Sequence, residues 1–339
     1  MFLKTKNLFR TLRAILGIFV FKKSETIITM DTDSNKRMDD LTKDFMEIVA
    51  PLIVPNIGRE KWAISSGYSV CLSPDFVLDT SYEPKGRRFV HFTSVRALFS
   101  ILNENAIRLY NLDNVNDPRE YDYLAEKFDQ SSELSLLKSD TFLFSLCCID
   151  VLESSNILNL WRLYGDNGFG VVIEFEIIFF ENNHVIRNYY FGNIDYAYSN
   201  KIDDIEKGLS EFYNKNHVSA DISNVLRVFG CFIKSPYFKV EEETRLILAR
   251  ESLSMFDNDS FFQDINFRNE LVEYHKIKLG VHKKDIPLIK IKRIQLGFRH
   301  SEESFKAIQM HLSKALIQNG CTKDELPIIE HSLLKNIYR

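Results

Sequence analysis

The sequence predicts an α+β fold, in which a mixed, mostly antiparallel central sheet carries flanking helices. Short runs rich in β-branched and aromatic residues, such as residues 140–149 and 168–180, are typical of buried strands. Other segments place apolar residues at helical spacing, as in residues 94–106 and 301–320. Strands and helices do not alternate strictly along the chain, which favours this class over a parallel α/β fold.

Composition excludes several classes of protein. The 339 residues are 45% hydrophobic, enough to bury the core of one large domain or two modest ones. A formal net charge of −4 gives no global attraction to nucleic acid or anionic membrane, so polyanion binding would have to be local. The five cysteines are scattered and form no C-x-x-C pair, which indicates neither a disulfide framework nor a zinc site. A reducing cytoplasm is the expected location.

Three regions are expected along the chain. Residues 1–40 form a basic, apolar leader and a polar linker, residues 41–86 an N-terminal extension, and residues 87–339 the core domain. The apolar stretch of the leader, residues 14–21, is too short for a bilayer span of about 20 residues. It is open whether residues 1–22 form a surface-seeking helix that touches a membrane, a signal peptide, or a segment outside the natural product, with Met30 as the start.

The first elements are expected in this order. Residues 41–54 have helical periodicity that stops at Pro55, and residues 66–88 are turn-rich and expected to be irregular. A strand over 87–93 leads into a helix capped by Ser94, and the chain returns in a strand over 107–112.

Strands and helices are also expected to intermix in the second half of the chain. The strands over 140–149 and 168–180 flank a helix that ends at Gly165, where Gly165, Gly168 and Gly170 are expected to supply positive φ angles. Charged and apolar residues alternate over 239–249, as in a half-buried strand. A polar helical stretch, a strand over 286–297 and a helix capped by Ser301 and stopped by Gly320 complete the chain.

Five segments in a fixed order resemble a known bacterial family. They are "HFTSVRALFSILNENAIRLYNLDNVNDPREY", "FLFSLC", "NLWRLYGDNGFGVVIEFE", "KVEEETRLIL" and "IKRIQLGFRHSEESFKAI". This set is similar to the domain of unknown function family 2971, over about residues 87–337. That family is similar to abortive-infection proteins, so the resemblance implies a role in phage defence.

A weaker resemblance is to the ADP-ribosyltransferase fold. In that fold a histidine on the first strand, a serine or tyrosine on a middle strand and a glutamate on a later strand converge on NAD. The order His91, Ser145, then Glu243 or Glu241 is similar. The resemblance implies that His91, with help from Thr93, binds the adenosine ribose. It also implies NAD as co-substrate, with Tyr164 or Trp161 replacing the usual nicotinamide-stacking tyrosine.

The E-x-E-x-R segment fits such chemistry. Alternation with a period of two would place Glu241, Glu243 and Arg245 on one face of a strand. A carboxylate there would stabilise the oxocarbenium charge that develops when the nicotinamide bond breaks. Arg245 would orient that carboxylate or hold a pyrophosphate. The same pattern is also typical of a solvated strand face with cross-strand salt bridges.

Other candidates have equally plain structural interpretations. His91, between aromatic residues, is typical of a core or rim position. Asn116, Asp117 and Glu120 surround a turn fixed by a proline, so they either line a cleft or only build the turn. Trp161 is a further cleft candidate that is equally suited to the core.

Two function classes remain open. One is an NAD-dependent transferase or glycohydrolase, and the other is a non-catalytic sensor or antitoxin-like module that binds a small nucleotide or a protein partner. No metal site is expected, since the histidines never pair at i, i+4 and no D-x-[DE]-x-K pattern suggests a nuclease. Cys147 and Cys148 lie on a buried strand, which disfavours a nucleophilic role.

Overall fold

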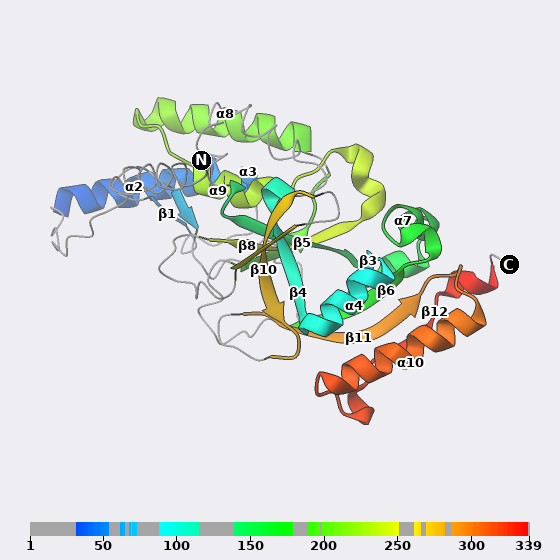
Figure 1. Ribbon diagram of the computed structural model, residues 1–339. Helices are drawn as coiled ribbons and strands as arrows, with labels where there is room; N and C mark the ends of the chain where they lie inside the picture. Colours follow the sequence, from blue (N-terminus) through cyan, green and yellow to red (C-terminus); the bar gives the residue numbers. More distant parts are fainter. Residues whose placement is uncertain are drawn as a thin grey trace, which may run out of the picture. The chain divides into compact units, whose positions relative to one another are not determined.

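The computed structural model describes most of the chain (Figure 1). The described residues are 32–53, 62–64, 68, 70–72, 88–114, 138–178, 189–196, 198–250, 261–265, 269–281 and 286–337. The chain divides into two units, Met1–Asp39 and Asp40–Arg339. The described part of the second unit is an α+β structure with a large mixed, mostly antiparallel sheet, which confirms the predicted fold class.

The large sheet has ten strands in the described part of the chain, and its main path runs β12-β11-β6-β3-β5-β4-β10-β9. In the described part of the chain, the strand pairs of this sheet are antiparallel except β11 with β12. Its strands are β3 (Arg88–Thr93), β4 (Ala106–Asn111), β5 (Thr141–Cys148), β6 (Val171–Ile178), β7 (Tyr189–Asn193), β8 (Glu243–Ala249), β9 (Phe261–Ile265), β10 (Leu271–Lys278), β11 (Leu288–Leu296) and β12 (Ile328–His331).

Strand β5 is the branch point of the sheet. β8 pairs with Thr141–Cys147 along one edge, and β7 pairs with the far edge of β8. β3 and β4 therefore share the other edge of β5, where β4 meets Phe142 and Leu143 while β3 meets Cys147 and Cys148. Residues 144–146 lie between these two ladders and pair with neither strand on that edge.

Apolar residues cover both faces of the sheet. On one face, alternate residues of β3, β5, β6 and β8 pack against α4 (Val95–Glu104) and α10 (Glu302–Gln318). On the other face, Val90, Phe92 and Cys147 pack against α7 (Ile157–Leu163). The predicted helix caps are confirmed, since Ser94 Oγ accepts from Ala97 N and Ser301 Oγ accepts from Ser304 N.

The helical N-terminal region begins earlier than predicted. α2 (Thr32–Ile48) starts inside the expected polar linker, and α3 (Ala50–Ile53) follows it. Phe45 packs edge-on against Phe212 of α8 (Tyr198–Asn216), with the ring centroids 5.8 Å apart. Apolar packing rather than composition thus sustains the end of this helix. The predicted boundaries of the three regions stay a prediction.

Strands lie in two stretches where the sequence predicted none. One stretch was expected to be irregular and the other helical. β1 (Trp62–Ile64) pairs with β2 (Val70–Leu72), which lies inside the stretch expected to be irregular, and α9 (Ser223–Gly230) packs beside β2. The polar stretch expected to be helical forms the antiparallel pair β9 and β10. Stacking of Phe262 on Tyr274 across that pair explains why the strand pairing prevails over the polar composition.

The turn between α7 and β6 differs from the glycine prediction. Of the three predicted glycines, only Gly168 has a positive φ, 86°. The other positive φ angles of this turn belong to Asp166, at 50°, and Asn167, at 53°. Gly170 is required for close approach, because a Cβ there would lie 2.3 Å from the Thr93 carbonyl oxygen. The other short elements are η2 (Leu112–Asn114), η3 (Ile149–Glu153), η4 (Asp166–Gly168), η5 (Pro236–Glu241), η7 (Lys323–Glu325) and η8 (Leu333–Asn336).

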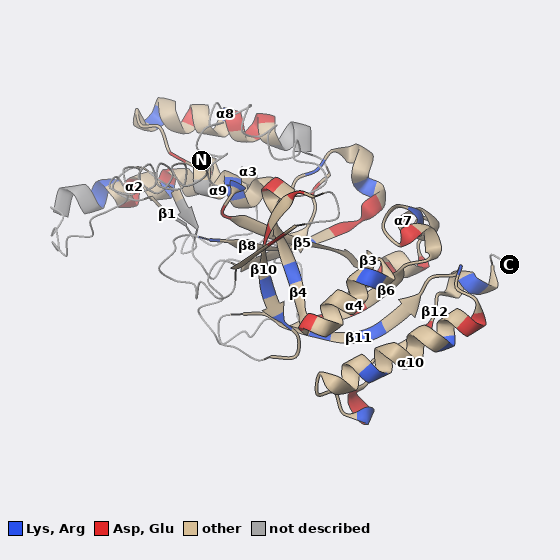
Figure 2. Cartoon of the chain, viewed as in Figure 1, with Lys and Arg blue, Asp and Glu red and all other residues tan. Residues whose placement is uncertain are grey.

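The described helices were compared for their surface charge and for their apolar character. α8 carries both lysines and acidic residues along its length (Figure 2). In the described part of the chain, no helix combines the length and apolar character needed to cross a membrane.

Candidate functional site

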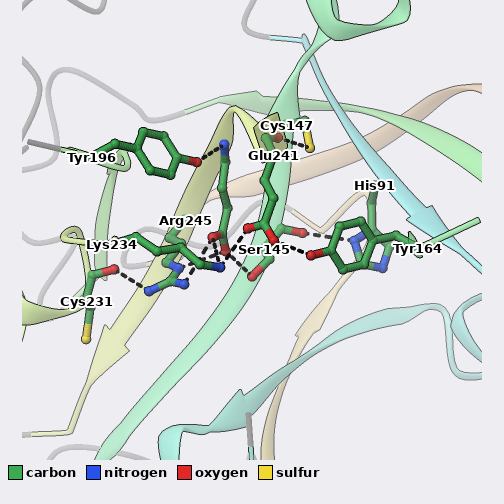
Figure 3. A network of polar contacts seen from close by, with 10 residues as sticks. His91, Ser145, Cys147, Tyr164, Tyr196, Cys231, Lys234, Glu241 and Arg245 are labelled. Atoms are coloured by element: carbon green, nitrogen blue, oxygen red, sulfur yellow. Dashed lines mark hydrogen bonds and ion pairs between the residues drawn. The ribbon is translucent and has the colours of Figure 1, made fainter. Parts of the chain in front are cut away.

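A buried polar cluster lies at the start of β8 (Figure 3). Glu243 is its centre, since Ser145, Lys234 and Arg245 all contact its carboxylate. Glu243 Oε1 accepts from Ser145 Oγ at 2.6 Å and from Arg245 Nε at 2.8 Å. Its Oε2 accepts from Arg245 Nη2 at 3.1 Å and from Lys234 Nζ at 3.3 Å. The backbone N–H of Glu243 donates to the Tyr196 hydroxyl at 2.9 Å. Both carboxylate oxygens therefore have two donors each.

The surroundings keep Glu243 ionised. Burial alone would raise its pKa, but the charges and hydrogen bonds of Arg245, Lys234 and Ser145 lower the pKa to about 2. Burial and the charges of Glu243 and Glu241 raise the pKa of Tyr196, and the bond from the Glu243 N–H offsets only part of this rise, so the Tyr196 hydroxyl stays protonated at neutral pH. The site thus holds a permanent carboxylate in a place from which water is largely excluded.

Glu241 joins the cluster from outside the strand. It is the last residue of η5, and its Oε2 accepts from Lys234 Nζ at 2.7 Å. Its Oε1 accepts from the hydroxyl of Tyr164, whose pKa is raised by burial and by this bond. Lys234 therefore bridges Glu241 and Glu243, and its ammonium also lies 4.7 Å from the centre of the Phe238 ring.

The predicted alternation over the E-x-E-x-R segment is only partly right. Glu243 and Arg245 lie on one face of β8, as predicted, and bind each other. The strand, however, begins at Glu243, because Glu242 adopts a left-handed conformation with φ 46°. Glu241 reaches the same cluster through this break in the chain rather than through strand alternation. The strand is also fully buried rather than half-buried.

Arg245 anchors the carboxylate to the framework. Its Nε and Nη2 form a side-on pair of bonds to the two oxygens of Glu243, while Nη1 donates to the Cys231 carbonyl at 2.8 Å. Such a planar fork fixes the orientation of a carboxylate more firmly than a single bond would. Of the two predicted roles, the geometry favours orientation of the carboxylate.

His91 lies at the split in the sheet. Its Nδ1 is 2.9 Å from the Ser145 carbonyl oxygen, which faces the edge that β3 and β4 leave unpaired. Burial lowers the pKa of His91 to about 4, and the bond to Ser145 offsets only part of this effect. The ring is therefore neutral at pH 7. Because a carbonyl only accepts, Nδ1 carries the proton and Nε2 is left as an acceptor.

His91 and the carboxylates approach β5 from opposite faces. The His91 ring packs 4.6 Å from Phe144, whose side chain belongs to the core on the α4 face. Ser145, opposite Arg245, and Cys147, opposite Glu243, project towards the other face. His91 thus meets the cluster through a backbone carbonyl, and no contact joins it to Glu241 or Glu243 among the described residues.

The remaining candidates fall into three groups. Thr93 ends β3 beside Val171 and is half-buried. Trp161 is fully buried and packs edge-on against Phe92 and Phe298, as expected of a core residue. Three predicted residues lie outside the described part of the chain: Asn116, Asp117 and Glu120.

The sequence prediction missed Lys234 and Tyr196. Lys234 follows the apolar stretch Cys231–Ile233, and a lone lysine after buried residues is a signal that a carboxylate partner lies nearby. Tyr196 carried no such signal, since its partner is a backbone N–H on a strand far along the chain.

The described residues provide neither a metal-binding group nor, at Cys147, a reactive thiol. In the part of the chain that the structure describes, no group of three or more His, Cys, Asp or Glu residues is arranged to hold a metal ion. Cys147 donates to the Glu241 carbonyl at 3.2 Å, and burial together with the nearby carboxylates raises the pKa of its thiol to about 12. This thiol is therefore a poor nucleophile.

Comparison with known proteins gives one match. The family model described as "Protein of unknown function (DUF2971)" matches residues 160–246. This range covers the end of α7, all of β6 and β7, the start of β8 and the whole run from Lys234 to Arg245. The chain is similar to that family over this segment, in agreement with the resemblance seen in the sequence. Searches of curated proteins and of solved structures gave no match.

Proposed function

We propose that the cluster around Glu243 binds the nicotinamide riboside half of NAD and supports transfer of the ADP-ribosyl group to an acceptor or to water. The observation that carries this proposal is the permanently ionised Glu243, held beside Ser145 by Arg245 and Lys234. In the reaction the bond between nicotinamide and C1′ of the ribose breaks, and nicotinamide leaves with the electron pair. The acceptor oxygen then bonds to C1′ and loses its proton.

Each residue has a defined part in this proposal. Glu243 would accept the ribose 2′-hydroxyl in place of the Ser145 hydroxyl and stabilise the positive charge that develops at C1′. Glu241 would provide a second carboxylate, and Tyr164, 39% exposed, a ring for nicotinamide. Arg245 and Lys234 act through Glu243 as positioning residues. His91 lies on the other face of β5 from Glu243, so the proposal gives no part in this site to His91 or to Thr93, which shares its face of β3.

A second candidate function is a non-catalytic binding module. The observation that favours it is the complete pairing of Glu243, whose two oxygens accept four hydrogen bonds or ion-pair contacts from protein groups. Such a carboxylate can be purely structural. The placement of both candidates in phage defence, in the bacterial cytoplasm, is inferred from the resemblance to abortive-infection proteins.

The experiment that separates the two candidates uses the full chain and millimolar NAD. Free nicotinamide and ADP-ribosylated products are measured for the wild type and for Glu243→Gln, whose amide keeps the shape of the side chain. Release by the wild type that the variant loses, with an unchanged circular dichroism spectrum, supports the enzyme. An NAD-dependent rise in Tm without release supports the binding module. If the wild type shows no nicotinamide release and no NAD-dependent shift in Tm, this result contradicts NAD binding.

A further inference from the structure

A buried arginine outside the Glu243 cluster has no acidic partner among the residues that the structure describes. Arg227 lies in the last turn of α9 and is 3% exposed. Its Nη1 is 3.5 Å from the Arg250 carbonyl oxygen, at the limit of a hydrogen bond. Its Nε is completely enclosed and has no acceptor among the described residues. The hydrogen bond of this side chain in that part of the chain comes from Nη1, so Nη2 has no protein acceptor there either. Neither donor on the edge formed by Nε and Nη2 is therefore paired within the described residues.

Arg245 shows what such a guanidinium binds in this protein. Its Nη1 also donates to a backbone carbonyl, that of Cys231, and its Nε and Nη2 hold the two oxygens of the Glu243 carboxylate. In Arg227, Nη1 likewise contacts a backbone carbonyl, that of Arg250, and the edge formed by Nε and Nη2 remains. The difference is that no carboxylate of the described part of the chain occupies this edge of Arg227. The geometry of the edge matches a planar pair of oxygens.

In the described part of the chain, the carboxylates that pair with the Arg250 side chain are Asp140 and Glu273, and neither pairs with Arg227. The Arg250 guanidinium binds Asp140 at 2.9 Å through Nε and lies 3.5 Å from Glu273 through Nη1. The carbonyl end of α9 offers Arg227 a partial negative charge, but this supplies no acceptor to Nε. Burial of a cation without hydrogen-bond acceptors is unfavourable, so such residues are rarely kept without a purpose.

We propose that Arg227 is the anchor of an oxyanion-binding site, which takes the phosphate or carboxylate group of a small molecule through Nε and Nη2. The site is separate from the Glu243 cluster and does not depend on the function proposed for it. Arg250, whose carbonyl fixes Arg227, follows Arg245 by five residues, about 17 Å along an extended strand.

This role makes an unusual prediction about stability. Replacement of a structural arginine lowers the Tm, whereas replacement of an unsatisfied binding arginine by an apolar residue of similar length raises it. Arg227→Met should therefore unfold at a higher temperature than the wild type in the absence of oxyanions. The same variant should lose every oxyanion-dependent rise in Tm.

The test follows the Tm of the full chain with sodium phosphate, sodium acetate or ADP, each compared with sodium chloride at equal ionic strength. At several times the dissociation constant, the effective oxyanion should raise the wild-type Tm by about 2–4 °C. Arg227→Lys, which keeps the charge but not the planar fork, should lose most of this rise. Arg96→Met on the exposed side of α4 should keep it, as should Glu243→Gln.

The pattern of shifts identifies the ligand or overturns the proposal. A rise with phosphate and ADP but not acetate indicates a phosphate group, a rise with ADP alone indicates a nucleotide, and a rise with acetate indicates a carboxylate. The proposal is wrong if none of the three shifts the wild type, or if Arg227→Lys responds as strongly as the wild type. Because the wild type and the lysine variant decide these outcomes, the test stands even where Arg227→Met does not fold.

Discussion

Replacement of Glu243 by glutamine should change stability in a way that depends on pH. The Glu243 carboxylate has a pKa of about 2 in the folded chain, whereas a glutamate side chain without partners has a pKa of 4.5. This difference corresponds to about 3 kcal/mol of stability at neutral pH. Because the folded pKa is the lower one, the contribution is complete above about pH 5 and is lost as the pH falls towards 2. At pH 3 about 1 kcal/mol should remain.

The assay is urea unfolding of wild type and Glu243→Gln at pH 7, 4 and 3, followed by circular dichroism. The variant should be less stable at pH 7 by about 3 kcal/mol, and the two curves should approach each other at pH 3. Glu153→Gln, which changes an exposed carboxylate on η3, is the matched control and should unfold with the wild type at pH 7.

A constant gap between wild type and Glu243→Gln over this pH range would refute the reasoning. It would mean that the ionised carboxylate gains nothing from Arg245 and Lys234 beyond its desolvation, and that the loss in the variant comes from packing alone.

Three other substitutions test the remaining parts of the structure. Lys234→Met leaves Glu241 and Glu243 without their shared cation and should destabilise the chain by about 3–5 kcal/mol, with acid unfolding at a higher pH than in the wild type. His91→Phe removes the donor to the Ser145 carbonyl and should lose about 1–3 kcal/mol at pH 7. Since burial lowers the pKa of His91 to about 4, this difference should shrink as the pH falls from about 6.5 towards 4, which urea curves at pH 7, 6 and 5 would show. Gly297→Ala places a Cβ 2.1 Å from the Gly168 carbonyl oxygen, and a Tm equal to that of the wild type would contradict this packing.

The sequence alone predicted the elements whose signals are local. Ser94 and Ser301 cap the helices that they were expected to cap, because an N-cap depends on a serine side chain and on N–H groups two or three residues further along. The shared face of Glu243 and Arg245 followed from strand periodicity for the same reason. The fold class rested on many such segments, so errors in single elements did not change it.

The parts that were not predicted depend on irregular backbone conformation, which leaves no periodic pattern in the sequence. Lys234 precedes Glu241 and Glu243 by only seven and nine residues, but the segment between α9 and β8 has no strand or helix periodicity from which its contacts could be predicted. Glu241 left the predicted face because Glu242 adopts a left-handed conformation, which glutamate favours less than asparagine or glycine. The same holds for Asp166, whose positive φ replaces that expected of Gly165.

The charge balance of the cluster limits which part of a ligand it can receive. Glu241 and Glu243 are matched by Lys234 and Arg245, so the four groups together are neutral. A neutral hydroxyl that displaces Ser145 from Glu243 would preserve this balance, whereas a phosphate placed there would add charge beside two carboxylates in a buried site. If NAD binds at this cluster, a ribose must therefore lie at Glu243 and the pyrophosphate outside the four charged groups. Arg245 cannot serve the pyrophosphate while its Nε and Nη2 hold Glu243, so the cation that receives it must come from elsewhere in the protein.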